Sequence, residues 1–272
     1  MSDPWIGLRA TTRARIGLGR TGNALPIKDV LTFQLAHARA RDAVHTPLDT
    51  EALAKAIAPL PAISVHSKAA DREIYLRRPD LGRQLDTGCL IAPSGPCDVV
   101  FVLADGLSPT GVQRHAPPFL RACFDRLADW TIAPVVIATQ ARVALGDEIG
   151  TQLQATLCVM LIGERPGLSV ANSLGVYITY QPRPGRQDSE RNCISNIHED
   201  GLAYDAAADI LVWLMTEARR RKLTGVRLKA DRLITLDDDA GNDDSGRGFA
   251  PSPATLAVAD AAELPGRRTE SP

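Results

Sequence analysis

Four continuous apolar runs lie in the middle of the chain. They cover residues 98–104, 134–138, 157–162 and 176–180, and β-branched side chains are common in them. Short apolar runs without polar alternation are typical of strands that are buried on both faces, as in a parallel sheet. The runs therefore predict a sheet that is covered by helices on both sides.

Helical spacing of apolar residues surrounds these runs. Residues 27–45 carry apolar side chains three or four positions apart, which predicts a helix with one buried face. Thr50 is a candidate cap for a second helix over residues 51–58. The same spacing predicts further helices over residues 118–130, 146–155 and 202–222.

Alternation of strands and helices predicts an α/β fold with a doubly wound parallel sheet. We expect a small helical N-terminal domain over residues 1–60 and the α/β domain over residues 61–236. Residues 237–272 are acidic and rich in Gly, Pro, Ser and Ala, which predicts a disordered tail.

Composition changes this picture little but removes some classes of partner. The 272 residues carry a formal net charge of −1, so we expect neither a nucleic acid nor a membrane as partner. The sequence lacks a run of about 20 apolar residues that could span a bilayer. Its first residues also lack the apolar segment of a signal peptide, so the expected location is the cytoplasm.

The five cysteines do not form a C-x-x-C pair. In a reducing compartment this pattern predicts free thiols, and we expect no metal site.

Two motifs suggest other classes of function. Gly17-Leu-Gly19-Arg-Thr-Gly22 matches the dinucleotide-binding G-x-G-x-x-G, but no strand is predicted before it, so a glycine-rich turn is favoured. Cys193 or Ser195 with His198 would suit a hydrolase, although no orienting acid is placed by a known spacing. A nucleotide-binding module and a hydrolase are thus the two alternatives.

Polar side chains follow two of the predicted strands. Asp105 and Ser108 come after the first, and Glu164 comes after the third. Ligands of doubly wound sheets bind at the carboxyl ends of strands, so these residues are candidates for ligand contact. For Asp105 and Ser108, a tight turn with a helix cap explains the sequence equally well.

Several of these segments together resemble a known family. TTRARIGLGRTGNALP, YLRRPDLGR, DGLS, GERPGL and RNCISNIH occur in this order within residues 8–230. They resemble the small, or light, subunit of ethanolamine ammonia-lyase. The resemblance implies a Rossmann-like domain after a helical N-terminal part, and a role in converting ethanolamine to acetaldehyde and ammonia with adenosylcobalamin.

The same resemblance implies a partner and a cofactor site. A large barrel subunit would hold the substrate and most catalytic groups, and the small subunit would close over the cobalamin. The implied cobalamin contacts fall on Val143, Glu164 and Cys193 of this sequence, and no catalytic residue is implied here. A bacterial microcompartment is an alternative location, but the N-terminal extension of the enteric relatives is lacking.

Overall fold

The computed structural model of the chain describes residues 3–92 and 95–229. Two compact units divide the chain, one containing the residues up to Gly17 and the other beginning at Leu18. Helix α1 (Ile6–Thr11) belongs to the first unit, and the other described helices and strands belong to the second. The tail predicted at 237–272 lies outside the described residues, and the domain boundaries at 60 and 236 stay predictions.

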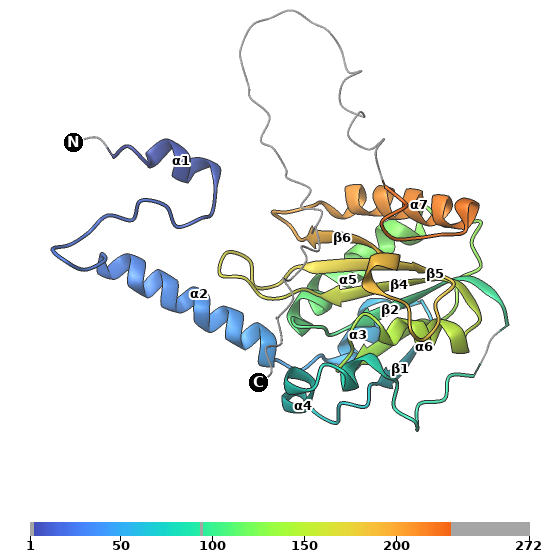
Figure 1. Ribbon diagram of the computed structural model, residues 1–272. Coiled ribbons are helices and arrows are strands. Elements are labelled where there is room, and N and C mark those ends of the chain that lie inside the picture. Colours follow the sequence, from blue (N-terminus) through green and yellow to red (C-terminus); the bar gives the residue numbers. More distant parts are fainter. Residues whose placement is uncertain (1–2, 93–94, 230–272) are drawn as a thin grey trace, which may run out of the picture. The chain divides into compact units, whose positions relative to one another are not determined.

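A six-stranded mixed sheet forms the centre of the second unit (Figure 1). Its strands lie in the order β1-β3-β2-β4-β5-β6. The first four are parallel, whereas β5 runs antiparallel to both β4 and β6. The strands are β1 (Ala62–His66), β2 (Cys97–Ala104), β3 (Val135–Thr139), β4 (Ala155–Gly163), β5 (Leu174–Tyr180) and β6 (Asn192–Ile197).

The fold is α/β, but the prediction of a parallel sheet is wrong for β5, which runs antiparallel to both of its neighbours. A parallel return needs a crossover of about a dozen residues or more, usually a helix. Residues 164–173 join β4 to β5 without a helix, so β5 has to return antiparallel. The four predicted strands are confirmed, and the sequence analysis missed β1 and β6.

The predicted helices are confirmed, and one begins earlier than expected. They are α2 (Ile27–His45), α3 (Thr50–Ala56), α5 (Pro109–Phe124), α6 (Leu145–Gln152) and α7 (Tyr204–Arg221). The sequence did not predict the short α4 (Arg72–Arg77) or the 3₁₀ turns η1 (Leu81–Arg83) and η2 (Asp188–Glu190). Helix α5 starts at Pro109 because the Ser108 side chain caps it, accepting a hydrogen bond from the Gly111 amide at 3.2 Å. No helix in the described part of the chain is long and apolar enough to cross a membrane.

Helices cover both faces of the sheet (Figure 1). Along β2, Phe101 and Leu103 face a core shared with α5, α7 and α3. Their neighbours Val100 and Val102 face a second core, to which α6 contributes Leu145. This alternation explains the continuous apolar runs, since every side chain of a central strand is buried.

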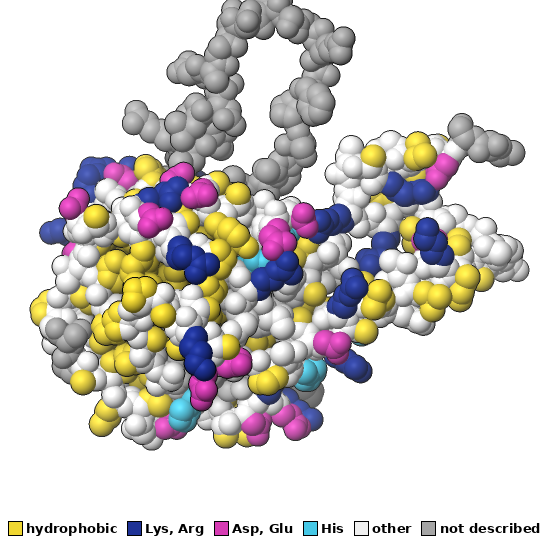
Figure 2. All heavy atoms as spheres, turned by 180° about the vertical axis from the view of Figure 1, so that it is seen from behind, with side chains coloured by type: hydrophobic (Ala, Val, Ile, Leu, Met, Phe, Trp, Pro, Cys, Tyr) yellow, Lys and Arg dark blue, Asp and Glu magenta, His cyan; other side chains and the backbone are white. Residues whose placement is uncertain are grey.

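Helix α2 differs from the prediction because its apolar face is not buried. Ile27, Leu31 and Leu35 are 71%, 56% and 51% exposed, and Ala43 is the buried residue of the helix. Figure 2 shows hydrophobic side chains at the surface of this N-terminal segment. An apolar stripe at helical spacing that this chain leaves uncovered is typical of a surface for a partner.

Candidate functional site

The loops that follow β2 and β4 are in close contact at the carboxyl edge of the sheet. The Leu107 amide donates to the Gly163 carbonyl at 2.9 Å. Gly106 has a φ of +55°, and a Cβ there would lie 2.3 Å from the Gly163 oxygen. The DGLS and GERPGL segments therefore belong to one structural unit, in which backbone packs directly on backbone.

Asp105 has a structural role in this edge. It is 2% exposed, and its carboxylate accepts hydrogen bonds from the backbone amides of Gln140 and Ala141 at 2.7 and 2.9 Å. Arg72 of α4 lies 3.5 Å from the same carboxylate. Burial raises the pKa of Asp105, and these donors oppose that shift. The sequence left two interpretations open for Asp105, a contact to a ligand or a tight turn, and the structure shows the tight turn.

Glu164 connects three segments at the end of β4. Its carboxylate accepts a short hydrogen bond from the Ser173 hydroxyl, just before β5. The same carboxylate accepts from the Asn196 backbone amide of β6, with its two oxygens at 3.1 and 3.2 Å. Gly175 of β5 lies beneath this side chain, since a Cβ there would come within 3.0 Å of the Glu164 Oε1. Glu164 therefore lies across β5 because that position has no side chain.

Cys193 lies near Glu164 through the pairing of β5 with β6. In the ladder it is opposite Tyr177, whose hydroxyl hydrogen-bonds the Cys193 side chain. Glu164 is close enough for its charge to act on both of these groups. Cys193 is exposed, so the thiol and the carboxylate form one polar cluster that solvent can reach.

The cysteine is not prepared to act as a nucleophile. Although part of Cys193 is exposed, desolvation by the surrounding protein raises its pKa to about 11. The Tyr177 hydrogen bond opposes this shift, and the Glu164 charge adds to it. Reactive cysteines have the opposite property, a lowered pKa that keeps the thiolate. Cys193 is thus a neutral thiol at neutral pH.

Both ring nitrogens of His198 form hydrogen bonds within the turn that contains it. Its Nδ1 accepts from the Asp200 amide at 3.3 Å, so the proton lies on Nε2, which donates to the Asn196 Oδ1 at 2.9 Å. A Cβ on Gly201 would lie 2.5 Å from the same Nε2. Neither nitrogen is available to take a proton from Cys193 or Ser195, which removes the geometric basis of the hydrolase alternative.

Val143 lies outside this hydrogen-bonded cluster. It follows β3, immediately before α6, and is half-buried against the core on the α6 side. The preceding Arg142 is fixed, with its guanidinium 4.4 Å from the centre of the Tyr75 ring. Val143 and Tyr177 pack against the same core, so the three predicted cofactor contacts share one face of the sheet.

A buried ion pair that no sequence pattern predicted lies on the same side of the sheet as α6. Arg191, just before β6, donates to the two carboxylate oxygens of Asp147 on α6 at 2.8 and 2.6 Å, and both side chains are 2% exposed. Arg191 also donates to the Thr179 hydroxyl of β5 at 2.7 Å. Asp147 precedes the polar segment 191–198 by more than forty residues, and no sequence motif joins them.

The G-x-G-x-x-G segment is a glycine turn. Gly17, Gly19 and Gly22 all have positive φ values, of 55°, 78° and 60°. Helix α1 precedes them and α2 follows, and within residues 3–26 there is no strand of the kind that the dinucleotide motif requires.

Comparisons with known proteins agree along nearly the whole chain. The family model of the ethanolamine ammonia-lyase light chain matches residues 2–229. The ethanolamine ammonia-lyase small subunit of Pseudomonas fluorescens (strain Pf0-1) is 49% identical over 253 residues, which cover 89% of this chain and 92% of that protein. That of Pseudomonas syringae pv. tomato is 47% identical over 258 residues, covering 90% of each chain.

Proposed function

Because the chain belongs to the ethanolamine ammonia-lyase light-chain family, we propose that it binds adenosylcobalamin together with a large catalytic subunit, and so serves the conversion of ethanolamine to acetaldehyde and ammonia. The observation that carries the cofactor role is the cluster of Glu164 and Cys193 over Gly175. In this cluster the Glu164 carboxylate is a strong hydrogen-bond acceptor, and the exposed Cys193 makes this face of the sheet accessible to solvent.

The donors and acceptors in this cluster suit a corrin. The edge of a corrin carries amide groups, and a carboxylate accepts their N–H bonds while keeping its contacts to the protein, since its two oxygens offer about four lone-pair sites. Glu164 uses some of these sites for Ser173 and Asn196, which also fixes its direction. Cys193 as a neutral thiol offers a packing contact, and Val143 offers an apolar one.

When bound, adenosylcobalamin supplies radical chemistry through its weak cobalt–carbon bond. The residues of this chain orient one side of the cofactor and keep water from it, and the large subunit supplies the groups that act on the substrate. Two observations support this assignment of roles to the subunits. The thiol of Cys193 is neutral, and both nitrogens of His198 are engaged in hydrogen bonds.

The exposed apolar face of α2 supports the need for a partner. Ile27, Leu31 and Leu35 lie on one face of this helix, and all three are more than 50% exposed in this chain. Such a stripe costs solubility unless another surface covers it.

The proposal is tested by purification. A tagged form of this chain, co-expressed with an ethanolamine ammonia-lyase large subunit, should retain that subunit. After addition of adenosylcobalamin and removal of the excess, the complex should keep the visible absorption of a corrin. A chain that purifies alone, or a complex that keeps no corrin, would refute the proposed role.

A further inference from the structure

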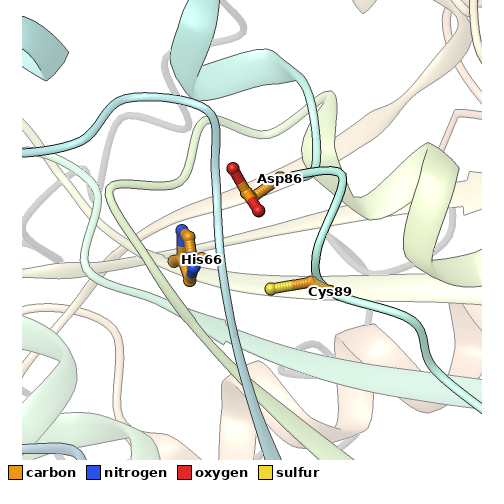
Figure 3. Close-up of side chains that lie close together, drawn as sticks. All are labelled: His66, Asp86 and Cys89. Atoms are coloured by element: carbon orange, nitrogen blue, oxygen red, sulfur yellow. The ribbon is translucent and has the colours of Figure 1, made fainter.

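Three side chains with metal-binding chemistry meet at the far edge of the sheet, and the proposed function uses none of them. They are His66, the last residue of β1, and Asp86 and Cys89 in the loop that follows η1 (Figure 3). One ligand atom of each lies within 4.8 Å of the other two. We propose that this cluster binds a divalent cation of the zinc class.

The backbone holds the two contributing segments side by side. The Asp86 amide donates to the His66 carbonyl at 3.0 Å, and the Lys68 amide donates to the Gln84 carbonyl at 2.9 Å. Within the loop, the Cys89 amide donates to the Asp86 carbonyl at 3.0 Å. The three ligand-bearing positions are therefore fixed relative to one another before any ion binds.

One imidazole nitrogen of His66 is already bonded, which leaves the other as the ligand atom that we propose. His66 Nδ1 lies 3.0 Å from the Ser67 carbonyl, and because a carbonyl only accepts, Nδ1 must be the donor. In the neutral ring the lone pair is then on Nε2. Ser67 is itself anchored, since it is 1% exposed and its hydroxyl donates to the Gln140 carbonyl at 2.6 Å. A backbone carbonyl bound to the second nitrogen is the usual support of a metal-binding histidine.

The carboxylate and the thiol have free ligand atoms. Asp86 accepts the Gly88 amide on Oδ1 at 2.8 Å, which orients the carboxylate and leaves Oδ2 for another partner. Among the described residues, neither Asp86 Oδ2 nor Cys89 Sγ has a hydrogen-bond partner. Cys89 and Asp86 are half-buried and His66 is exposed, so an ion can reach all three.

The mixture of donor atoms selects the class of ion. Magnesium and calcium prefer oxygen ligands throughout, whereas zinc accepts thiolate, imidazole and carboxylate together. A thiolate and a carboxylate also balance the two positive charges, and the thiol proton is released when the ion binds. Bond lengths of about 2.0–2.3 Å place tetrahedral ligand atoms roughly 3.3–3.8 Å apart. The ligand atoms lie within 4.8 Å of one another, and small rotations of these accessible side chains bring them to the tetrahedral spacing. Water then occupies the fourth ligand position.

The experiment uses the full chain, freed of metal by a chelator, with Zn²⁺ alone as the probe. Calorimetric titration should give one site, and Co²⁺ in its place should give the near-ultraviolet charge-transfer band of a cobalt–thiolate bond. Cys89→Ser should abolish this band, whereas Cys193→Ser, which changes the exposed thiol on β6, should keep it. His66→Gln should weaken zinc binding by at least about 10- to 100-fold, because loss of a ligand costs no less than loss of its support. His37→Gln on α2 is the matched control and should change nothing.

A measurement on the unaltered chain guards against variants that fail to fold. Zn²⁺ should slow alkylation of Cys89, located by peptide mass spectrometry, and leave alkylation of Cys193 unchanged. Absence of a zinc site in the titration, equal protection of both cysteines, or a cobalt–thiolate band that persists in Cys89→Ser would overturn the proposal.

Discussion

At the scale of single residues, a substitution can test whether the charge of Glu164 contributes to cofactor binding. Glu164→Gln keeps the shape of the side chain but removes the charge that strengthens its bonds as an acceptor. Loss of one charge-assisted hydrogen bond costs about 1.5–3 kcal/mol, so the adenosylcobalamin concentration for half-maximal activity of the complex should rise roughly 10- to 100-fold. The maximal rate should change little. Arg165→Gln, the exposed neighbouring charge, is the control.

Cys193→Ser should have a milder effect in the same titration, because a packing contact does not need a thiolate. An unchanged half-saturation point with a collapsed maximal rate, in either variant, would contradict the binding role and restore a catalytic one.

His115 on α5 makes the fold sensitive to acid. It is 2% exposed, its Nε2 donates to the Asn172 carbonyl at 2.8 Å, and its Nδ1 accepts from the Tyr204 hydroxyl at 2.8 Å. Burial lowers the pKa of His115 below the ordinary 6.5, and the Asn172 bond opposes this. The unfolded chain therefore binds the proton more readily, so stability is complete above pH 6.5 and decreases as the pH falls through the lowered pKa.

His115→Gln keeps a donor for the Asn172 carbonyl but cannot titrate. Urea unfolding about one pH unit above and below 6.5 should show a smaller loss of stability for the variant than for the unaltered chain. Equal losses would show that His115 does not carry this part of the pH dependence.

At the scale of secondary-structure elements, the ion pair of Asp147 and Arg191 holds α6 against the end of the sheet. Removing one partner leaves the other charge buried, so Asp147→Asn should lower the free energy of unfolding by about 3–5 kcal/mol. Glu199→Gln, which breaks the exposed pair with Arg114, should have a much smaller effect. Equal effects of the two variants in chemical denaturation would contradict the structural role of the pair.

Local pattern was enough to predict the elements with continuous apolar runs or clear helical spacing. Strand β6 was missed because its exposed positions carry polar residues such as Ser195 and Asn196, a pattern that is typical of a polar loop. Helix α5 was placed too late because Pro117 and Pro118 resemble a helix start, whereas the capped start at Ser108 lies a few turns earlier.

The candidate site was predictable as a set of residues but not as an arrangement. Family resemblance pointed to Glu164 and Cys193, yet their proximity depends on the antiparallel pairing of β5 with β6 and on the bare backbone at Gly175. The cluster of His66, Asp86 and Cys89 gave no sequence signal, because its parts are separated along the chain and lack the spacing of a zinc motif. The cysteine pattern had predicted free thiols there and no metal.

At the scale of the whole molecule, α2 is the element that this chain leaves incomplete. Charge in its apolar stripe should weaken the complex, so Leu31→Glu together with Leu35→Glu should reduce the amount of large subunit that co-purifies. Gln34→Glu adds one such charge at an exposed polar position of the same helix and should leave the yield unchanged. Equal yields from all three forms would show that the partner binds elsewhere.

The division of labour between the two subunits has one direct test, the deamination of ethanolamine with saturating adenosylcobalamin. This chain, the large subunit and their mixture are assayed separately for acetaldehyde. The mixture should turn over and this chain alone should not, because Cys193 is a neutral thiol and the nitrogens of His198 are already bonded. Sustained turnover by the isolated chain, or full turnover by the large subunit without it, would contradict the proposed roles of the two subunits.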